Sequence, residues 1–499
     1  MPFDTALRTL VDTHRPHLLA LGEPYHGEPA FPRLRNRILE TLAGLGFRSI
    51  AIESDRAAAL AVDDYVQGRR DDLDLTTGIS HGWGAHPATR ELVDWLRAYN
   101  EGHPSPISFY GFDAPTEITG APSPGPLLRS LRDHLGASVP ELDDLVGDDA
   151  RWSAPEIMYD AARSPGTSPE AAALLVIAED LRTRSAGDAR ATVLATTAIG
   201  LLTYHAAMAE PGTQSERIGR MLATRDALMA RNLMDIVALE RDRGPVLAAA
   251  NNAHLQRHPS TWDTHWEGRH LAAQWNGAGS IVSPLLGERY VYVAGSYGAG
   301  QPAVGTYEER LGPQTGIFPP PAGLRARTTD LLGYFPLDAA TVTGCEAVLH
   351  LGTEPGAVDA ARISGMPGVT ETRIPAGSEM PPYTWGDRFF FTGTDRKHPF
   401  ATIVYHDIPD FDTLSGLSAP DRYRLNVEVG RTEFNTLFGY GPESFAAQRA
   451  TIDFTAVDRL TPHPAYAVQG WASVVNPGPS TAAEVERLVT AARIRHSRR

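Results

Sequence analysis

Short runs of apolar residues recur along the first part of the chain, and several of them end directly at an acidic side chain. His17–Gly22 is followed by Glu23, and Phe47–Ile52 is followed by Glu53. Between them, Pro32–Ala43 carries leucine and isoleucine at helical spacing. A strand, a helix and a second strand within about 35 residues form a βαβ unit, so we expect the two strands to be parallel.

Four further apolar runs occur before residue 358: Ile107–Gly111, Val246–Ala250, Tyr290–Gly295 and Ala347–Leu351. Three long stretches have helical periodicity instead: Glu170–Ser185, Thr192–Ala209 and Glu216–Arg241. Strands that alternate with helices are typical of an α/β fold with a mostly parallel sheet and flanking helices. We therefore predict such a domain over residues 1–357, with a helical insertion at roughly residues 120–245 that covers one side of the sheet.

The pattern changes near residue 358. Short strand-like segments then follow one another, at Phe389–Phe391, Phe400–Tyr405 and Tyr423–Val429. The remaining stretch of about 140 residues is the size of one small domain. We therefore predict a separate α+β domain over residues 358–499.

Polar side chains follow four of the predicted strands at the point where each strand ends. They are Glu23, Glu53, Asp113 and the pair Asn251 and His254. His26 lies on the loop that follows Glu23. In an open parallel sheet, ligands bind at the carboxyl ends of the strands, where the strand order reverses. We therefore expect these side chains to line one pocket.

The segment Gly22–Phe31, with the sequence GEPYHGEPAF, contains the parts of a general base. The carboxylate of Glu23 can hydrogen-bond one imidazole nitrogen of His26 and raise its basicity, which leaves the other nitrogen for water. Glu53, which we expect on the neighbouring strand, can do the same or can orient the water. The ordinary pKa of histidine is about 6.5, so we predict His26 as the base that activates water.

Several longer motifs occur in a fixed order along the chain. The first set is GEPYHG, AIESD, FYGFDAP and NNAHLQR, and the second set is TRELVDWLRAYN, TRDALMARNL and GERYVYVAG. Taken together, these motifs resemble the erythromycin esterase family over roughly residues 1–357. The resemblance implies a hydrolase, because that family is known for hydrolysing macrolide lactones without a serine nucleophile.

The resemblance also implies roles for individual residues. The catalytic histidine and the two glutamates proposed for the family match His26, Glu23 and Glu53. The characteristic arginine of the family, nine residues after the histidine, matches Arg35. The implied activity is that of a carboxylic ester hydrolase, in antibiotic resistance or in natural-product biosynthesis.

The late H-N-x-H segment of the family matches residues 251–254, and here the sequence departs from the family. The first histidine is replaced by Asn251, and His254 remains. This departure weakens erythromycin itself as the substrate and leaves two alternatives open. One is an acid/base biosynthetic enzyme, such as a cyclase, dehydratase or isomerase of a polyketide-like molecule. The other is a protein that sequesters a small molecule without catalysis.

The predicted reaction is the hydrolysis of an ester or macrolactone of a natural-product-like small molecule. His26 takes a proton from water, and the hydroxide attacks the carbonyl carbon. Arg35 or His254 stabilises the oxyanion, a contribution of about 3–4 kcal/mol per donor.

The segment Gly78–Gly82 matches the G-x-S-x-G pattern of serine hydrolases. That pattern needs a buried strand before the serine, and the preceding residues DDLDLTT form none, so Ser80 is not the predicted nucleophile. Ser296 follows an apparent strand, but no helical pattern follows it. The SHGWG stretch instead resembles a segment that lines the cleft in the family. The predicted substrate contacts are His81, Trp83, Asp113 and Asn251.

A divalent metal is the main rival to a metal-free site. Carboxylates and imidazoles are ligands for zinc, manganese and iron. The candidate ligands are Glu23, His26, Glu53 and His254. The sequence lacks the H-E-x-x-H spacing that would point to a metal, and it lacks the P-loop and G-x-G-x-x-G motifs of nucleotide sites. We predict an enzyme without a required cofactor, in which a metal is optional.

Composition narrows the partners and the compartment. The net charge of −15 disfavours nucleic acid and anionic membranes, because both attract concentrated positive charge. Cys345 is the single cysteine, so neither an intrachain disulfide nor a thiolate zinc site can form. The first residues lack the pattern of a signal peptide, and no apolar run approaches the roughly 20 residues of a membrane span. We predict a cytoplasmic protein with a small-molecule substrate.

The second predicted domain resembles an uncharacterised small domain family over about Ile363–Ala492, which implies no known activity. Its aromatic residues Trp385 and Phe389–Phe391 are expected in the core. The polar candidates for a binding site are Arg388, His398, His406 and His463. We expect an accessory or binding module, or a scaffold for dimerisation.

Overall fold

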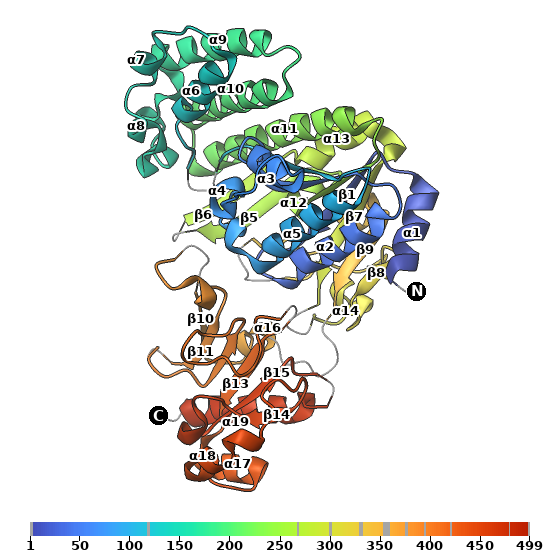
Figure 1. Cartoon of the computed structure of the whole chain (residues 1–499), viewed down its shortest axis with the longest axis vertical. Helices are drawn as coiled ribbons and strands as arrows, with labels where there is room; N and C mark the ends of the chain where they lie inside the picture. Colours follow the sequence, from blue (N-terminus) through green and yellow to red (C-terminus); the bar gives the residue numbers. More distant parts are fainter. Residues whose placement is uncertain are drawn as a thin grey trace. The chain divides into compact units, whose positions relative to one another are not determined.

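The structure is a computed structural model. It describes residues 3–116, 120–266, 269–298, 302–328, 333–352, 360–374, 378–393, 396–419, 422–478 and 480–497. The chain forms two compact units (Figure 1). The first comprises Met1–Ser296 and Ile317–Leu349, and the second comprises Tyr297–Gly316 and His350–Arg499. A segment well before residue 358 therefore packs with the second unit, and the division of the chain at that residue stays a prediction.

A seven-stranded sheet forms the centre of the first unit. Its strands, in spatial order, are β3 (Ser108–Asp113), β2 (Ser49–Asp55), β4 (Val246–Asn251), β1 (Leu18–Glu23), β7 (Tyr290–Tyr297), β9 (Ala347–Leu351) and β8 (Gly316–Phe318). β1 runs parallel to β4 and β7, and β2 runs parallel to β3 and β4. The predicted parallel α/β fold is confirmed. The expectation that β1 and β2 are neighbours is wrong, because β4 lies between them after the long helical excursion.

Helices flank this sheet in two groups. The first group is α1 (Phe3–His14), α2 (Ala30–Ala43), α3 (Ala59–Val66) and α5 (Pro87–Gly102), and the second is α11 (Gln214–Glu240) and α13 (Ala278–Leu286). The chain moves from β1 through α2 toward β2, but from β4 through α13 in the other direction, toward β7. Because parallel crossovers are right-handed, these two connections leave the sheet on opposite faces. The strand order therefore reverses between β1 and β4.

The predicted helical insertion is a small bundle with its own core. Its main helices are α6 (Gly125–Leu135), α7 (Leu142–Val146), α8 (Ala150–Ser153), α9 (Pro169–Arg184) and α10 (Ala189–Ala209). Leu128, Trp152, Leu174 and Ala198 lie in that core. Among the described residues, α10 is the one helix long and apolar enough to cross a membrane, and 78% of its most apolar window is buried within the protein. The apolar residues of α10 therefore serve the bundle core.

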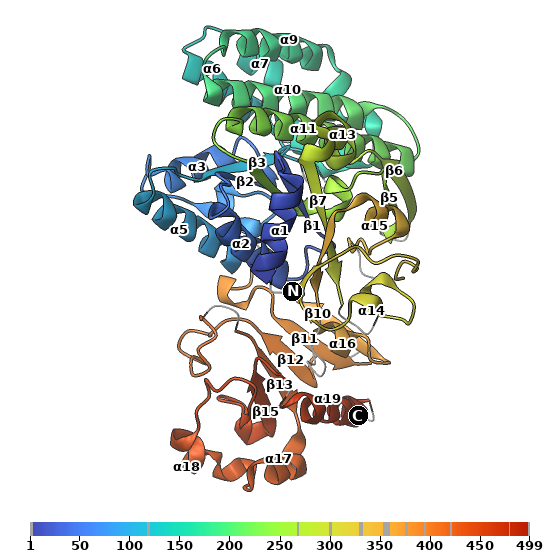
Figure 2. The ribbon, with the colours of Figure 1, turned by 90° about the vertical axis from the view of Figure 1, so that its right-hand side faces the viewer.

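A β-hairpin that the sequence pattern did not indicate follows β4. It consists of β5 (Ser260–Trp266) and β6 (Arg269–Trp275), which pair in antiparallel orientation, and β6 packs against α11. Other short elements of the first part of the chain include α4 (Leu75–Gly78), a 3-10 turn at Trp83–Ala85, α12 (Asn252–Leu255), α14 (Tyr307–Leu311) and α15 (Ala339–Gly344). Figure 2 shows the hairpin beside the parallel strands.

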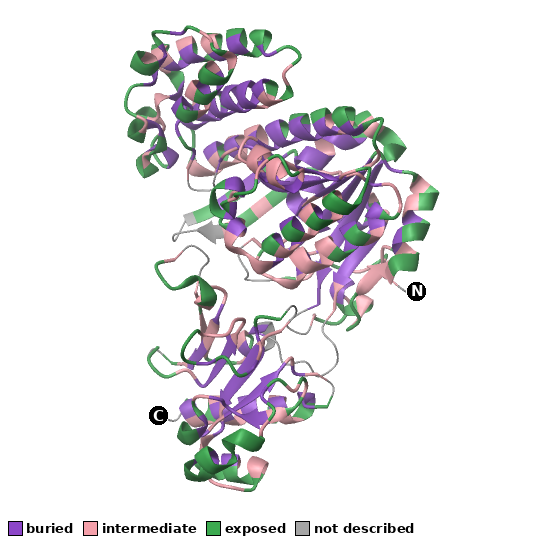
Figure 3. Ribbon diagram, in the orientation of Figure 1, coloured by how far each residue is buried: buried purple, intermediate pink, exposed green. Residues whose placement is uncertain are grey.

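The second unit contains a six-stranded antiparallel sheet. Its strands, in spatial order, are β10 (Val369–Arg373), β11 (Arg388–Thr392), β12 (Ala401–Val404), β13 (Arg424–Glu428), β15 (Trp471–Val475) and β14 (Leu460–Pro462). The α-helices that follow residue 358 are α16 (Ala360–Ser364), α17 (Gly430–Phe438), α18 (Phe445–Gln448) and α19 (Ala482–His496). Phe390 is buried in the core with Phe400 and Phe434, which confirms its predicted place in the core. Figure 3 shows buried residues along the strands of both large sheets.

The polar residues predicted as candidates in the second unit lie in different surroundings. Arg388 donates a hydrogen bond to Glu371 at 3.3 Å, and His398 lies exposed. His463 is buried, and its Nδ1 accepts hydrogen bonds from the backbone N–H groups of residues 465 and 466. These contacts give His463 a role in the local fold.

Candidate active site

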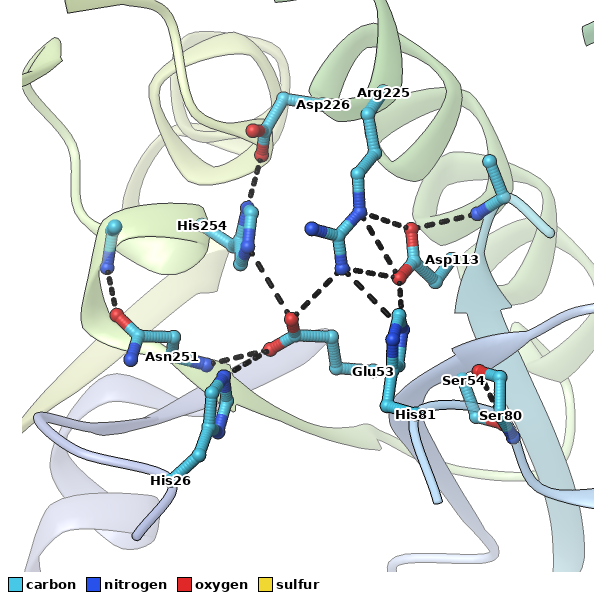
Figure 4. A network of polar contacts seen from close by, with 12 residues as sticks. His26, Glu53, Ser54, Ser80, His81, Asp113, Arg225, Asp226, Asn251 and His254 are labelled. Carbon is cyan, nitrogen blue, oxygen red and sulfur yellow. Dashed lines mark hydrogen bonds and ion pairs between the residues drawn. The ribbon is translucent and has the colours of Figure 1, made fainter. Parts of the chain in front are cut away.

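The reversal of strand order brings the predicted polar residues to one edge of the parallel sheet (Figure 4). Glu23 ends β1, Asp113 ends β3 and Asn251 ends β4, while Glu53 lies near the end of β2. α12 begins directly after β4 and carries His254. The carboxyl ends of neighbouring strands thus supply an acidic cluster with two histidines beside it.

His26 lies between two carboxylates. Its Nδ1 is 2.5 Å from Oε1 of Glu23, and its Nε2 is 3.6 Å from Oε2 of Glu53. Its ring centroid is 4.8 Å from that of Trp83. The His26 side chain is 34% exposed, whereas that of Glu53 is 3% exposed. His26 therefore occupies the wall of the site, and Glu53 lies at its base.

Glu53 is the centre of the polar network in Figure 4. Its Oε1 accepts a hydrogen bond from Nη2 of Arg225 at 3.0 Å and lies 3.3 Å from Nε2 of His254. Its Oε2 accepts the backbone N–H of Asn251 at 2.9 Å. Burial alone raises the pKa of Glu53, but the charges of His254 and His26 outweigh it and hold the pKa well below its usual range.

Asp226, on α11, is a functional candidate that the sequence reasoning missed. Its Oδ1 lies 2.8 Å from Nδ1 of His254 and also accepts the backbone N–H of Ala278. Its Oδ2 accepts the indole N–H of Trp275 at 2.8 Å. The fully buried carboxylate therefore fixes the ring of His254, so that Nε2 is directed toward Glu53.

Arg225, the residue before Asp226, was missed as well. Its guanidinium donates to both oxygens of Asp113 as well as to Glu53. Nε2 of His81 lies 2.9 Å from Oδ2 of the same Asp113. His81 has a φ of 59°, a left-handed conformation that is uncommon for a residue other than glycine. Both missed residues lie in the TRDALMARNL motif. In the sequence they could not be told from charged residues on the exposed face of a long helix.

The two histidines beside Glu53 hold protons strongly. Burial alone lowers the pKa of His254, but the charges of Asp226 and Glu53 outweigh it and raise the pKa to about 10. Withdrawal from bulk water likewise lowers the pKa of His26, and the charge of Glu53 with the hydrogen bond to Glu23 raises it to about 10. Both imidazoles are therefore protonated at neutral pH.

A cavity of about 300 Å³ opens beside these groups. The polar lining consists of His26, Glu53, His81, Arg225, Asn251 and His254. The apolar lining consists of Trp83, Leu222, Ala253, Trp262, Trp275, Gly333 and Phe335. Two of the tryptophans come from the hairpin of β5 and β6, so this hairpin forms one wall of the cavity.

Arg35 and Asn251 differ from the other predicted residues in their surroundings. Arg35, on α2, lines a smaller cavity of about 50 Å³ together with Glu23 and His26, and its guanidinium donates to Oδ1 of Asn36. Burial lowers the pKa of Arg35 to about 10. The side-chain oxygen of Asn251 accepts the N–H of residue 253, so this side chain caps α12.

The groups that lie closest to a metal-binding arrangement share only Glu53 with the predicted set of ligands. Among the described residues, Glu53, His81 and Asp113 offer ligand atoms within 4.8 Å of one another. The guanidinium of Arg225 already bonds to two of these three residues, so a fixed positive charge lies where a cation would be held.

Ser80 lies in a tight turn rather than beside a base. Its Oγ accepts the backbone N–H of Asp55 at 3.0 Å, and its own N–H donates to Oγ of Ser54. These contacts give Ser80 a role in the local fold. Ser296 is fully buried.

Comparisons with known proteins agree with the fold. A family model described as Erythromycin esterase matches residues 43–336, and a model of a family of unknown function, DUF6194, matches residues 358–499. Glu23, His26 and Arg35 precede the range that the first model matches. No curated protein matches the sequence.

Solved structures are also similar to the chain, two of them with a TM-score of 0.50 or above. One is a histidine-to-asparagine mutant of the erythromycin esterase EreC in its open conformation, with 16% identity, a TM-score of 0.50, and coverage of 70% of this chain and 97% of that chain. The other is a succinoglycan biosynthesis protein, with 14% identity, a TM-score of 0.52, and coverage of 70% and 90%. At these identities the likeness shows the fold alone.

Proposed function

The chain belongs to the erythromycin esterase family, and from this premise we propose that it hydrolyses an ester or lactone of a natural-product-like molecule, with water activated at His26 and without a serine nucleophile. Membership in the family supports a hydrolase of the esterase kind. The base and the substrate are our own proposal.

One observation carries the proposal. The imidazole of His26 lies between Oε1 of Glu23, at 2.5 Å, and Oε2 of Glu53, at 3.6 Å, on the wall of a cavity large enough for an organic molecule. A site that only binds a small molecule has no need of a partly exposed histidine that is oriented by two carboxylates. This arrangement supports proton transfer to or from a bound water.

The reaction follows from these positions. The unprotonated Nε2 of His26 takes a proton from water, while Glu23 holds the opposite nitrogen. The hydroxide attacks the carbonyl carbon, and the protonated His254 on the far side of Glu53 donates to the oxyanion. The bond from carbon to the leaving oxygen then breaks, and the proton taken up by His26 passes to that oxygen. The products are a carboxylic acid and an alcohol, joined in one molecule when the substrate is a lactone.

The lining of the cavity favours a substrate with an apolar skeleton. Trp83, Trp262 and Trp275 present large rings around the acidic cluster. Ester and lactone carbonyls attached to an apolar skeleton match this lining. The natural-product class of the substrate remains part of the proposal, as does a role in resistance or biosynthesis.

Incubation with a panel of esters and lactones, followed by mass spectrometry, tests the proposal. We expect at least one substrate to gain the mass of one water. We also expect His26→Ala to abolish that gain while circular dichroism stays close to that of the wild type. Ser80→Ala is the matched control and should retain turnover, because Ser80 serves a turn.

The other outcomes of the same experiment are informative. An unchanged mass with altered retention would indicate isomerisation, and binding without change would indicate sequestration. Substantial turnover in His26→Ala would refute the assignment of the base.

A further inference from the structure

A second cavity, of about 490 Å³, lies in the first unit apart from the catalytic cavity. It is bounded by the beginning of α10, by the last turns of α11 and by Arg56, which directly follows β2. The two helices run side by side in both Figure 1 and Figure 2. The two cavities share no lining residue. A ligand here would therefore leave the catalytic residues accessible.

Arg56 is the distinctive residue of this cavity. Its side chain is only 5% exposed, and its Nη1 donates to the backbone carbonyl of Asn232 at 3.2 Å. Within the described ranges, this is the one hydrogen bond of its side chain, and no carboxylate oxygen lies within 4 Å of its nitrogens. An arginine side chain keeps its charge in proteins and has five N–H groups. The described residues therefore supply no acceptor for most of these donors, although the negative charge of Asp235, which lines the same cavity, acts on the guanidinium.

The other buried arginines of the protein are bonded more fully. Arg217, Arg225 and Arg424 each make at least three side-chain hydrogen bonds to carbonyl, amide or carboxylate groups. This contrast is meaningful because buried N–H donors without acceptors are destabilising. A ligand with acceptor oxygens would therefore supply the hydrogen bonds that Arg56 lacks.

The surroundings of Arg56 define the ligand. The walls include the apolar side chains of Val193, Ala238 and Leu239, and Leu239 is 53% exposed at the rim. Asp188 and Asp235 also line the cavity. Because the two aspartates outnumber the single guanidinium, a ligand with one negative charge meets less repulsion than a dianion such as phosphate. The flat edge of a guanidinium matches the two oxygens of a carboxylate.

We propose that this cavity binds a small monocarboxylate with an apolar tail, whose carboxylate pairs with Arg56 and whose tail packs against Val193 and Leu239. The cavity volume lies within the range of roughly 300–1,000 Å³ that is typical of small-molecule sites. The proposal goes beyond the hydrolase function and does not depend on it.

Calorimetric titration of the full-length chain with octanoate tests the proposal. We expect saturable binding of octanoate, and weaker binding of both uncharged octanamide and inorganic phosphate. Arg56→Gln should weaken octanoate binding by about tenfold or more, because a charge-assisted pair is lost. The absence of saturable octanoate binding, or equal affinity in Arg56→Gln, would overturn the proposal. Phosphate binding as tight as that of octanoate would overturn the ligand class.

A second variant keeps the test decisive if Arg56→Gln does not fold. Leu239→Asp places a negative charge at the exposed rim, so it should fold and should repel octanoate. Val176→Asp is the matched control, because Val176 is 70% exposed on α9 and does not line the cavity. We expect wild-type affinity in the control and weaker binding in Leu239→Asp. Equal affinity in these two variants would exclude this cavity as the site.

Discussion

Three cationic side chains surround Glu53, and each has a further carboxylate partner; for Arg225 that partner is Asp113. His26 is paired with Glu23 at 2.5 Å, and His254 is paired with Asp226 at 2.8 Å. Each histidine therefore forms a dyad with one carboxylate, and Glu53 is a further partner of both histidines. This arrangement stabilises the protonated imidazoles. His26 can therefore act as a base only after it has lost a proton that the neighbouring carboxylates hold strongly.

The first prediction concerns the pH dependence of turnover. The pKa of His26 is raised to about 10, so at pH 7 roughly one molecule in a thousand has the unprotonated base. The base form increases as the pH rises toward that pKa, and kcat/KM should rise with it through pH 7, 8 and 9. Initial rates across this range provide the measurement, and a plateau already reached at pH 7 would contradict the prediction.

The matched variant for this profile is Glu23→Gln. It removes a negative charge from Nδ1 of His26 while keeping a side chain of similar shape. The pKa of His26 should fall, and the rising limb of the profile should move to lower pH. An unshifted limb would mean that a group other than His26 controls the rate.

The second prediction concerns Asp226 as a positioning residue. Asp226→Asn keeps the size of the side chain but removes the charge that holds the proton on Nδ1 of His254. We expect kcat to fall by about 10²-fold or more, because a positioned proton donor typically contributes that much. KM should change less, since Asp226 does not line the cavity. Steady-state kinetics with thermal unfolding separates this effect from a loss of folding, and an unchanged kcat in a folded variant would rule out the role.

At the scale of elements, the parallel strands explain why part of the site was predictable. Glu23, Glu53, Asp113 and Asn251 could be placed at one edge because the carboxyl ends of parallel strands meet there. Arg225 and Asp226 could not, because they lie within α11, whose amphipathic pattern does not reveal which residues face the sheet edge. The hairpin that supplies Trp262 and Trp275 has no clear alternation of apolar and polar residues, so its place in the cavity wall follows only from tertiary packing.

The third prediction tests the turn that carries Trp83. The buried Gly84 packs so closely on α4 that an added Cβ would lie 2.0 Å from the carbonyl oxygen of Leu75. Gly84→Ala should therefore displace the turn, raise KM, and lower the free energy of unfolding by about 1–3 kcal/mol. Kinetics and urea denaturation provide the readouts. Gly102→Ala, at the end of α5, is the control, since an added Cβ meets nothing within 4 Å there.

At the scale of the whole molecule, the two site histidines are not the only groups with a pKa shifted toward the range between pH 7 and pH 9, because burial raises the pKa of Asp387 to about 7. The titration of Asp387 is largely complete by about pH 8. Lys397 is the single lysine of the sequence. The other basic side chains are those of arginine and histidine. Burial raises the pKa of Cys345 to about 12, which removes the thiol from this window as well. A change of overall stability in mildly alkaline solution therefore reports mainly on His26 and His254.

The fourth prediction is that stability falls over the pH range in which turnover rises. The pKa of each site histidine is raised from about 6.5 in the unfolded chain to about 10 in the folded protein, so the folded state binds more protons between these values. Their stabilisation is fully present below about pH 6.5 and is lost as the pH rises through 10, with a slope of up to about 1.4 kcal/mol per pH unit for each histidine. The share of His26 is smaller, because its side chain is 34% exposed and solvent screens its charges. Urea unfolding at pH 7, 8 and 9 measures the slope, and His254→Gln should flatten it. Stability that stays constant or increases over this range would show that the two imidazoles do not carry the extra protons, and would remove the basis for an alkaline rise in activity.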